Sequence, residues 1–69
     1  MSVYKMIEIV GTSPESWDKA AAAAVEKAGT TLRDLRIAEV IDQDLVIENG
    51  KVSQYRTKLK ISFKFEDSV

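Results

Sequence analysis

The most constraining feature of the sequence is an alternation of apolar and polar side chains that follows Asn49-Gly50 and runs from Lys51 to Glu66. Such alternation is typical of an antiparallel strand with one buried face, because successive side chains point to opposite faces of a sheet. Asn-Gly is the strongest short signal for a type I′ turn. The sequence therefore predicts a long hairpin made of residues 36–48 and 51–66. The side chains on its mainly apolar face are those of Tyr55, Thr57, Leu59, Ile61, Phe63 and Phe65.

A strand and a helix are predicted before the hairpin. The strand covers residues 3–10 and ends at Gly11-Thr12. Ser13 is suited to the N-cap and Pro14 to the first helical position, while Gly29 is suited to end the helix. The predicted class is α+β in the order β-α-β-β, with a three-stranded antiparallel sheet packed on one helix. The apolar stripe of that helix consists of Trp17, Ala20, Ala21, Ala24, Val25 and Ala28.

A single chain of this kind leaves apolar surface uncovered. Its 69 residues allow one domain, residues 1–69, and 45% of them are hydrophobic, yet the chain has no cysteine for a disulfide. The second predicted strand has apolar side chains on both faces. Ala38 and Val40 are predicted on one face, and Ile37, Ile41, Leu45 and Ile47 on the other. The sequence therefore predicts self-association, with further copies covering the sheet.

The charge balance argues against nucleic acid as a partner, and the short apolar runs argue against a membrane. The formal net charge is −1, without the basic excess that nucleic-acid binders carry. The last strand carries a basic stripe, which consists of Arg56, Lys58, Lys60 and Lys64. This stripe has no interleaved aromatic side chain for base stacking. Pairing with Glu8 and Glu39 explains the stripe better. No apolar run approaches the roughly 18 residues of a membrane span. The N-terminal residues do not resemble a signal peptide, so we expect a soluble, cytoplasmic protein.

The side chains available for chemistry do not predict an enzyme. Histidine and cysteine are absent, and the glycines are too isolated to form a phosphate-binding loop. Asp42, Gln43 and Asp44 carry hard oxygen ligands of the kind that Ca²⁺ or Mg²⁺ prefers. The residues alone favour a polar, solvent-facing stretch of strand over a cation site. However, where copies of this strand meet at a symmetry axis, their carboxylates would repel unless a cation joined them.

The sequence resembles the dodecin family over nearly its whole length. Residues 3–13, 38–40 and 63–66 carry the resemblance, and the strand ending in Gly-Thr-Ser before a helix with Trp and Ala is its most specific part. The resemblance implies a hollow, roughly spherical shell of twelve identical subunits. In such a shell the helices lie outside and the sheets face inward, so the main partner of the chain is the chain itself.

The resemblance also implies where a ligand site departs from the usual pattern. Many dodecins hold flavins between tryptophans, but that position is Ile37 here, and Ile37 has no π-face for stacking. A glutamine that normally bonds the flavin ring is Arg56 here, which can only donate. Asp42 matches a family acidic position near the polar tail of the ligand, with Gln43 beside it. Glu15 matches a position associated with cations. Taken together, the resemblance and the oxygen ligands of residues 42–44 give a predicted metal set of Glu15, Asp42 and Asp44. The predicted flavin-site positions are Ile37, Arg56, Asp42 and Gln43.

These observations lead to one main functional hypothesis and two alternatives. The main hypothesis is a non-enzymatic homododecameric binding or storage shell that binds Ca²⁺ or Mg²⁺ and lacks the usual stacked-flavin site. The first alternative is a dodecin that binds and stores riboflavin or FMN, which a yellow colour of the purified protein would reveal. The second is a structural or adaptor particle, for which calorimetry with either cation would give no heat of binding.

Overall fold

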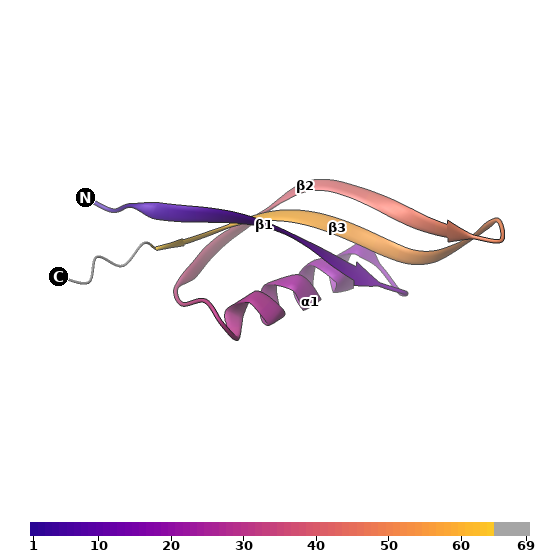
Figure 1. Cartoon of the computed structure of the whole chain (residues 1–69), viewed down its shortest axis with the longest axis horizontal. Coiled ribbons are helices and arrows are strands. Elements are labelled where there is room, and N and C mark those ends of the chain that lie inside the picture. Colours follow the sequence, from indigo (N-terminus) through magenta and orange to yellow (C-terminus); the bar gives the residue numbers. More distant parts are fainter. Residues whose placement is uncertain (65–69) are drawn as a thin grey trace.

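The computed structural model describes residues 1–64, which form one helix and one sheet. The elements are β1 (Tyr4–Ser13), α1 (Trp17–Gly29), β2 (Leu35–Glu48) and β3 (Lys51–Lys64). The sheet is antiparallel with the strand order β1-β3-β2, so the last strand is central. The predicted α+β class and β-α-β-β order are confirmed, with α1 covering one face of the sheet (Figure 1). The predicted strand positions Phe65 and Glu66 lie outside the described residues.

The turn between β2 and β3 has the predicted conformation. Asn49 and Gly50 have φ values of 53° and 73°. A type I′ turn requires positive φ at both central residues, and its twist matches that of the flanking strands. The β2–β3 hairpin consequently extends well past the helix (Figure 1), and the described chain is 54 Å long but only 20 Å and 14 Å across.

The helix begins later than the sequence predicts. β1 does not end at Val10, because residues 11–13 stay paired with residues 55–57 of β3. The N-cap is Ser16, whose Oγ accepts from the Lys19 N–H at 3.1 Å. Ser13 instead ends β1, and its Oγ accepts from the Glu15 N–H at 3.0 Å. The predictions of Ser13 as the N-cap and Pro14 as the first helical residue were therefore wrong.

The core lies between α1 and the central strand. Thr57, Leu59 and Ile61 of β3 are almost fully buried, and they face an alanine stripe on the helix. Thr57 satisfies its hydroxyl by donating to the Trp17 carbonyl oxygen at 3.0 Å. The predicted apolar stripe is confirmed, because its buried members are Ala20, Ala24 and Ala28, with Ala21 and Val25 partly buried.

β2 is the most exposed element and the least regular. Its pairing with β3 is shifted at three places, one of them between Val40 and Asp42. The extra residue there, Ile41, reverses the alternation, as a β-bulge does. Val40 and Leu45 therefore pair with β3 residues of the same face, and the prediction that they lie on opposite faces was wrong.

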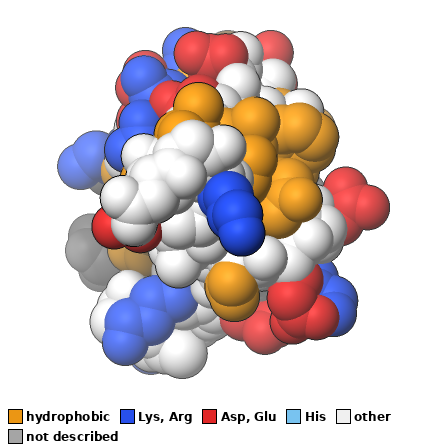
Figure 2. Space-filling model, turned by 90° about the vertical axis from the view of Figure 1, so that its right-hand side faces the viewer, with side chains coloured by type: hydrophobic (Ala, Val, Ile, Leu, Met, Phe, Trp, Pro, Cys, Tyr) orange, Lys and Arg blue, Asp and Glu red, His pale blue; other side chains and the backbone are white. Residues whose placement is uncertain are grey.

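Much apolar surface remains exposed, as the sequence predicts. Figure 2, which looks onto the end of the molecule that carries the β2–β3 turn, shows hydrophobic side chains gathered in a patch between charged ones. A monomeric protein seldom exposes so many large apolar side chains along one strand. Those exposed on β2 are Ile37, Val40, Ile41, Leu45 and Ile47.

Candidate functional site

The sheet face that points away from α1, here called the open face, carries the charged side chains in cross-strand rows. Lys60 of the central strand lies between Glu8 of β1 and Glu39 of β2, as predicted. Lys58 and Arg56 lie opposite Asp42 and Asp44 of β2 in the next two rows. Each cation of these rows therefore has a carboxylate on a neighbouring strand. Lys64, the remaining member of the basic stripe, lies opposite Tyr4 instead.

Asp44 and Arg56 form the best-defined polar contact of the open face. Arg56 Nε and Nη2 donate to the two carboxylate oxygens of Asp44 at 2.6 Å and 2.7 Å. This two-bond geometry fixes the guanidinium plane as well as its position. Both side chains are about half exposed, so the pair contributes little to stability. Its main effect is to hold the charge of Arg56 against β2.

The Asp44–Arg56 pair also changes how both groups titrate. The hydrogen bond from Arg56 holds the pKa of the Asp44 carboxyl below its ordinary value of 3.8. The same hydrogen bond raises the pKa of Arg56. A lowered carboxyl pKa gives a stabilisation that is complete above the unfolded value and is lost as the pH falls through the folded value. The pair is therefore intact at neutral pH and opens only in acid, below 3.8.

We expect Arg56→Gln to return the pKa of Asp44 toward its ordinary value, because the main cause of the lowering is removed. Carbon-13 NMR titration of the Asp44 carboxyl in both proteins measures the change. Lys60→Gln is a matched control, since it removes a cation of the same strand and face that pairs with other residues. Identical Asp44 titration curves in the parent and in Arg56→Gln would contradict the assignment.

Asp42 and Gln43 do not point to the same side of the sheet. Asp42 pairs with Lys58 on the open face, and its Oδ1 accepts from the Gln43 N–H at 2.9 Å. Gln43 pairs with Thr57, whose side chain is buried under the helix. Asp42 and Asp44 thus share the open face, and Gln43 is on the other.

Glu15 lies at the start of the helix and is held by a salt bridge. Its Oε2 is 2.7 Å from Lys19 Nζ, and both side chains are exposed. Within residues 1–64, no three acidic side chains come close enough together to hold a metal ion. A single described chain therefore does not gather Glu15, Asp42 and Asp44 into one site.

Ile37 lies in an apolar hollow of the open face. The hollow has a volume of about 380 Å³, and its other lining residues are Tyr4, Met6, Arg36 and Ser62. Ile37 pairs with Ser62, which lies six residues from Arg56 along β3. At about 3.3 Å per strand residue, the two positions are roughly 20 Å apart. One chain brings Asp42, Asp44 and Arg56 together around one hollow of the open face. Ile37 and Glu15 do not line that hollow, so neither predicted set is complete in the described chain.

Trp17 is a structural anchor rather than a ligand platform. Its Nε1 donates to the Asp44 carbonyl oxygen at 3.1 Å, and its ring makes an edge-on contact with Tyr55 at 5.2 Å between centroids. These contacts fix the start of α1 on the β2–β3 hairpin. Sequence reasoning missed that Asp44 meets Arg56, although the alternation had placed both residues on strands of one hairpin.

Comparison with known proteins identifies the family. The model of the Dodecin family matches residues 3–66. The chain belongs to the dodecin family. A curated relative, the calcium dodecin of Mycobacterium tuberculosis, is 52% identical over 64 residues, which cover 93% of this chain and 90% of the relative. The dodecin of Thermus thermophilus is 38% identical over 66 residues, which cover 96% of each protein.

Solved dodecin structures have the same fold. The dodecin from Streptomyces coelicolor superposes with a TM-score of 0.93 at 40% identity, covering 97% of this chain and 96% of the other. The calcium dodecin from M. tuberculosis, described as calcium-chelating with a novel calcium-binding site, gives a TM-score of 0.85 at 51% identity, covering 99% and 97%. Among residues 1–64 of this dodecin, no helix is long and apolar enough to cross a membrane.

Proposed function

We propose that this dodecin is a non-enzymatic homododecameric shell that binds or stores Ca²⁺ at sites shared between subunits. The observation that carries the proposal is that one chain has both incomplete acidic sites and exposed apolar surface. Asp42 and Glu15 are solvent-exposed carboxylates, but the described chain brings no third acidic ligand to either. Ca²⁺ takes six to eight oxygen ligands, which include carboxylates, carbonyl groups and water. In the proposed site, further copies of the chain supply the missing carboxylates.

Relatives support calcium rather than flavin as the ligand. The curated relative at 52% identity is a calcium dodecin. In this chain the position that the resemblance assigns to the stacking tryptophan is Ile37, and Arg56, at the glutamine position, is held by Asp44. Ca²⁺ also suits a site assembled from several flexible carboxylates better than Mg²⁺, which demands near-ideal octahedral geometry.

We expect Asp42→Asn to weaken Ca²⁺ binding by tenfold or more, because the site loses a charged oxygen ligand. Isothermal titration calorimetry on the assembled particle measures this, with Mg²⁺ as the competing ion. Glu15→Gln should weaken binding as well. Asp44→Asn should have a smaller effect, since Asp44 already shares its charge with Arg56.

Glu39→Gln is the matched control, because Glu39 is a carboxylate of the same strand and the same face that pairs with Lys60. The proposal requires its Ca²⁺ affinity to equal that of the parent. Native mass spectrometry reports the copy number and any retained ligand. A particle that assembles without any heat of Ca²⁺ binding would be a structural or adaptor particle, and a retained flavin mass would support the flavin alternative.

A further inference from the structure

Lys58 is held more loosely than the two cations beside it on the open face of β3. Arg56 donates two hydrogen bonds to one carboxylate of β2, and Lys60 lies between carboxylates on both neighbouring strands. Lys58 has Asp42 on the β2 side but Val10 on the β1 side. In the described part of the chain its ammonium group forms no salt bridge. Lys58 is therefore a cation that faces a carboxylate without being bonded to it.

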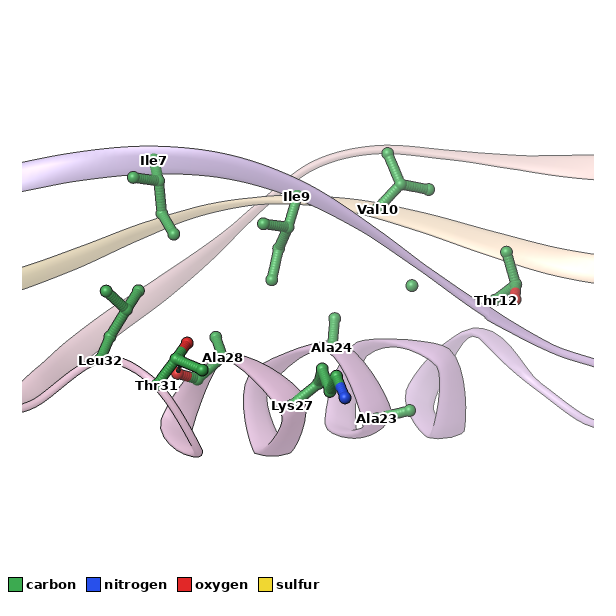
Figure 3. Close-up of a pocket in the computed structure, with 11 residues that line it drawn as sticks. Ile7, Ile9, Val10, Thr12, Ala23, Ala24, Lys27, Ala28, Thr31 and Leu32 are labelled. Atoms are coloured by element: carbon green, nitrogen blue, oxygen red, sulfur yellow. Dashed lines mark hydrogen bonds between the residues drawn. The ribbon is translucent and has the colours of Figure 1, made fainter.

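Val10 gives Lys58 no second partner. Figure 3 shows the side chain of Val10 directed away from the helix, on the opposite side of β1 from Ile7 and Ile9, which places it on the open face. An apolar side chain cannot compensate an ammonium group. In the described sheet, Asp42 is thus the carboxylate directly opposite Lys58, and the Cβ atoms of such a cross-strand pair lie about 4.5–5.5 Å apart.

The hollow beside Lys58 has charged side chains of both signs. Its volume is about 40 Å³, and a cavity needs about 10–15 Å³ to hold one water, so it has room for an ion and a water ligand. Besides the hydrogen bond from Arg56, the charge of Lys58 helps to lower the pKa of the Asp44 carboxyl. Lys58 thus acts on both carboxylates of the hollow. The lining consists of Val10, Asp42, Asp44, Arg56 and Lys58.

We infer that Lys58 is the resident counter-ion of Asp42 and gives way only to a divalent cation. This inference rests on the proposed function, in which Asp42 is a calcium ligand. The ammonium group already supplies one positive charge to the carboxylate, so Na⁺ or K⁺ gains nothing by replacing it, whereas Ca²⁺ brings twice the charge. The flexible four-carbon stem of Lys58 lets its ammonium group move into solvent. Arg56 is fixed by two hydrogen bonds and stays in place.

We expect Lys58→Gln to bind Ca²⁺ about tenfold more tightly than the parent, because the entering ion no longer meets the ammonium charge. Isothermal titration calorimetry on the assembled particle measures the change. Lys60→Gln is the matched control, since it makes the same change on the same strand and face beside other carboxylates. Its Ca²⁺ affinity should stay close to that of the parent. Lys58→Arg retains the charge and should also stay close.

Competition by monovalent cations provides a second readout. The Ca²⁺ affinity is measured in potassium chloride and in tetramethylammonium chloride at equal ionic strength, so that screening is the same and only the size of the cation differs. The parent should give equal affinities in the two salts. Lys58→Gln should bind Ca²⁺ more weakly in potassium chloride, because K⁺ then occupies the place of the ammonium group. Equal affinities of Lys58→Gln in both salts would overturn the inference.

The outcomes separate this inference from the proposed function. Parent binding with no gain in Lys58→Gln, or with an equal gain in Lys60→Gln, overturns the role of Lys58 and leaves calcium binding standing. Binding by Lys58→Gln but not by the parent supports the role and overturns calcium binding by the natural protein. No binding by any of these proteins overturns both.

Native mass spectrometry of the same samples covers the case in which Lys58→Gln fails to assemble. Assembly that requires Ca²⁺ supports the inference, because the ion then replaces the missing counter-ion. A Lys58→Gln chain that stays monomeric with and without Ca²⁺ makes Lys58 a structural residue and overturns the inference.

Discussion

Replacing Gly11 by alanine should be the most damaging single change of a small residue in this protein. A Cβ at position 11 would overlap the carbonyl oxygen of Ala20 and would lie 2.9 Å from the Cβ of Ala24. Backbone cannot move aside as a flexible side chain can, so the helix must lift from the sheet. Overpacking of this kind costs about 3 kcal/mol or more. Thermal unfolding at a fixed protein concentration, read by circular dichroism, measures the loss.

Gly29→Ala is the matched control for this prediction. It makes the same chemical change at the end of the same helix, where the nearest atom to a new Cβ is Leu35 Cδ1 at 3.8 Å. That distance is an ordinary contact, and alanine is a better helix former than glycine. We therefore expect Gly29→Ala to be neutral or slightly stabilising. Equal unfolding temperatures for the two variants would show that close packing at Gly11 is not what matters.

Local rules predicted the fold well where one residue type satisfies one requirement. Asn49 and Gly50 tolerate the positive φ that a type I′ turn needs, and the alternation after them could only be a half-buried strand. The start of the helix was predicted wrongly because two residues satisfy the same requirement. Ser13 and Ser16 are equally good caps by composition, and only the pairing of Ser13 with Tyr55 in the sheet decides between them.

The Asp44–Arg56 contact could not be predicted by counting from the turn. An undistorted hairpin that pairs Glu48 with Lys51 would place Arg56 opposite Gln43. The register shift beyond Ile47 leaves Ser53 unmatched and moves Arg56 opposite Asp44 instead. A bulge depends on twist and on packing against other elements, so the sequence of the strand pair alone does not reveal it.

The candidate sites were hard to predict for a different reason. Asp42 and Ile37 do lie on the open face, but the partners that would complete a cation or flavin site are not within reach in one chain. A sequence specifies its own fold through contacts within the chain, whereas a site at a symmetry axis depends on which surfaces of different copies meet. Family resemblance was therefore the only source for Glu15 and for the role of position 37.

The double variant Ile37→Trp/Arg56→Gln should bind FMN at least a hundredfold more tightly than the parent protein. Ile37 is 67% exposed and lies in a hollow with room for a larger ring. An aromatic side chain contributes about 1–3 kcal/mol for each ring it stacks on, and two copies that meet at a two-fold axis of the proposed shell would supply two such faces. The glutamine introduced in place of Arg56 would not form the ion pair with Asp44 and can both donate and accept. Quenching of FMN fluorescence measures the affinity.

The conservative pair Ile37→Leu/Arg56→Gln separates stacking from the loss of the arginine charge. It frees Asp44 in the same way but supplies no π-face, so its FMN affinity should stay close to that of the parent. Tight binding by this control would mean that Arg56 alone excludes flavin, through its charge. No binding by the tryptophan variant would mean that the copies do not bring two open faces together at Ile37. The two outcomes thus distinguish a site blocked by one side chain from a site that the assembly never forms.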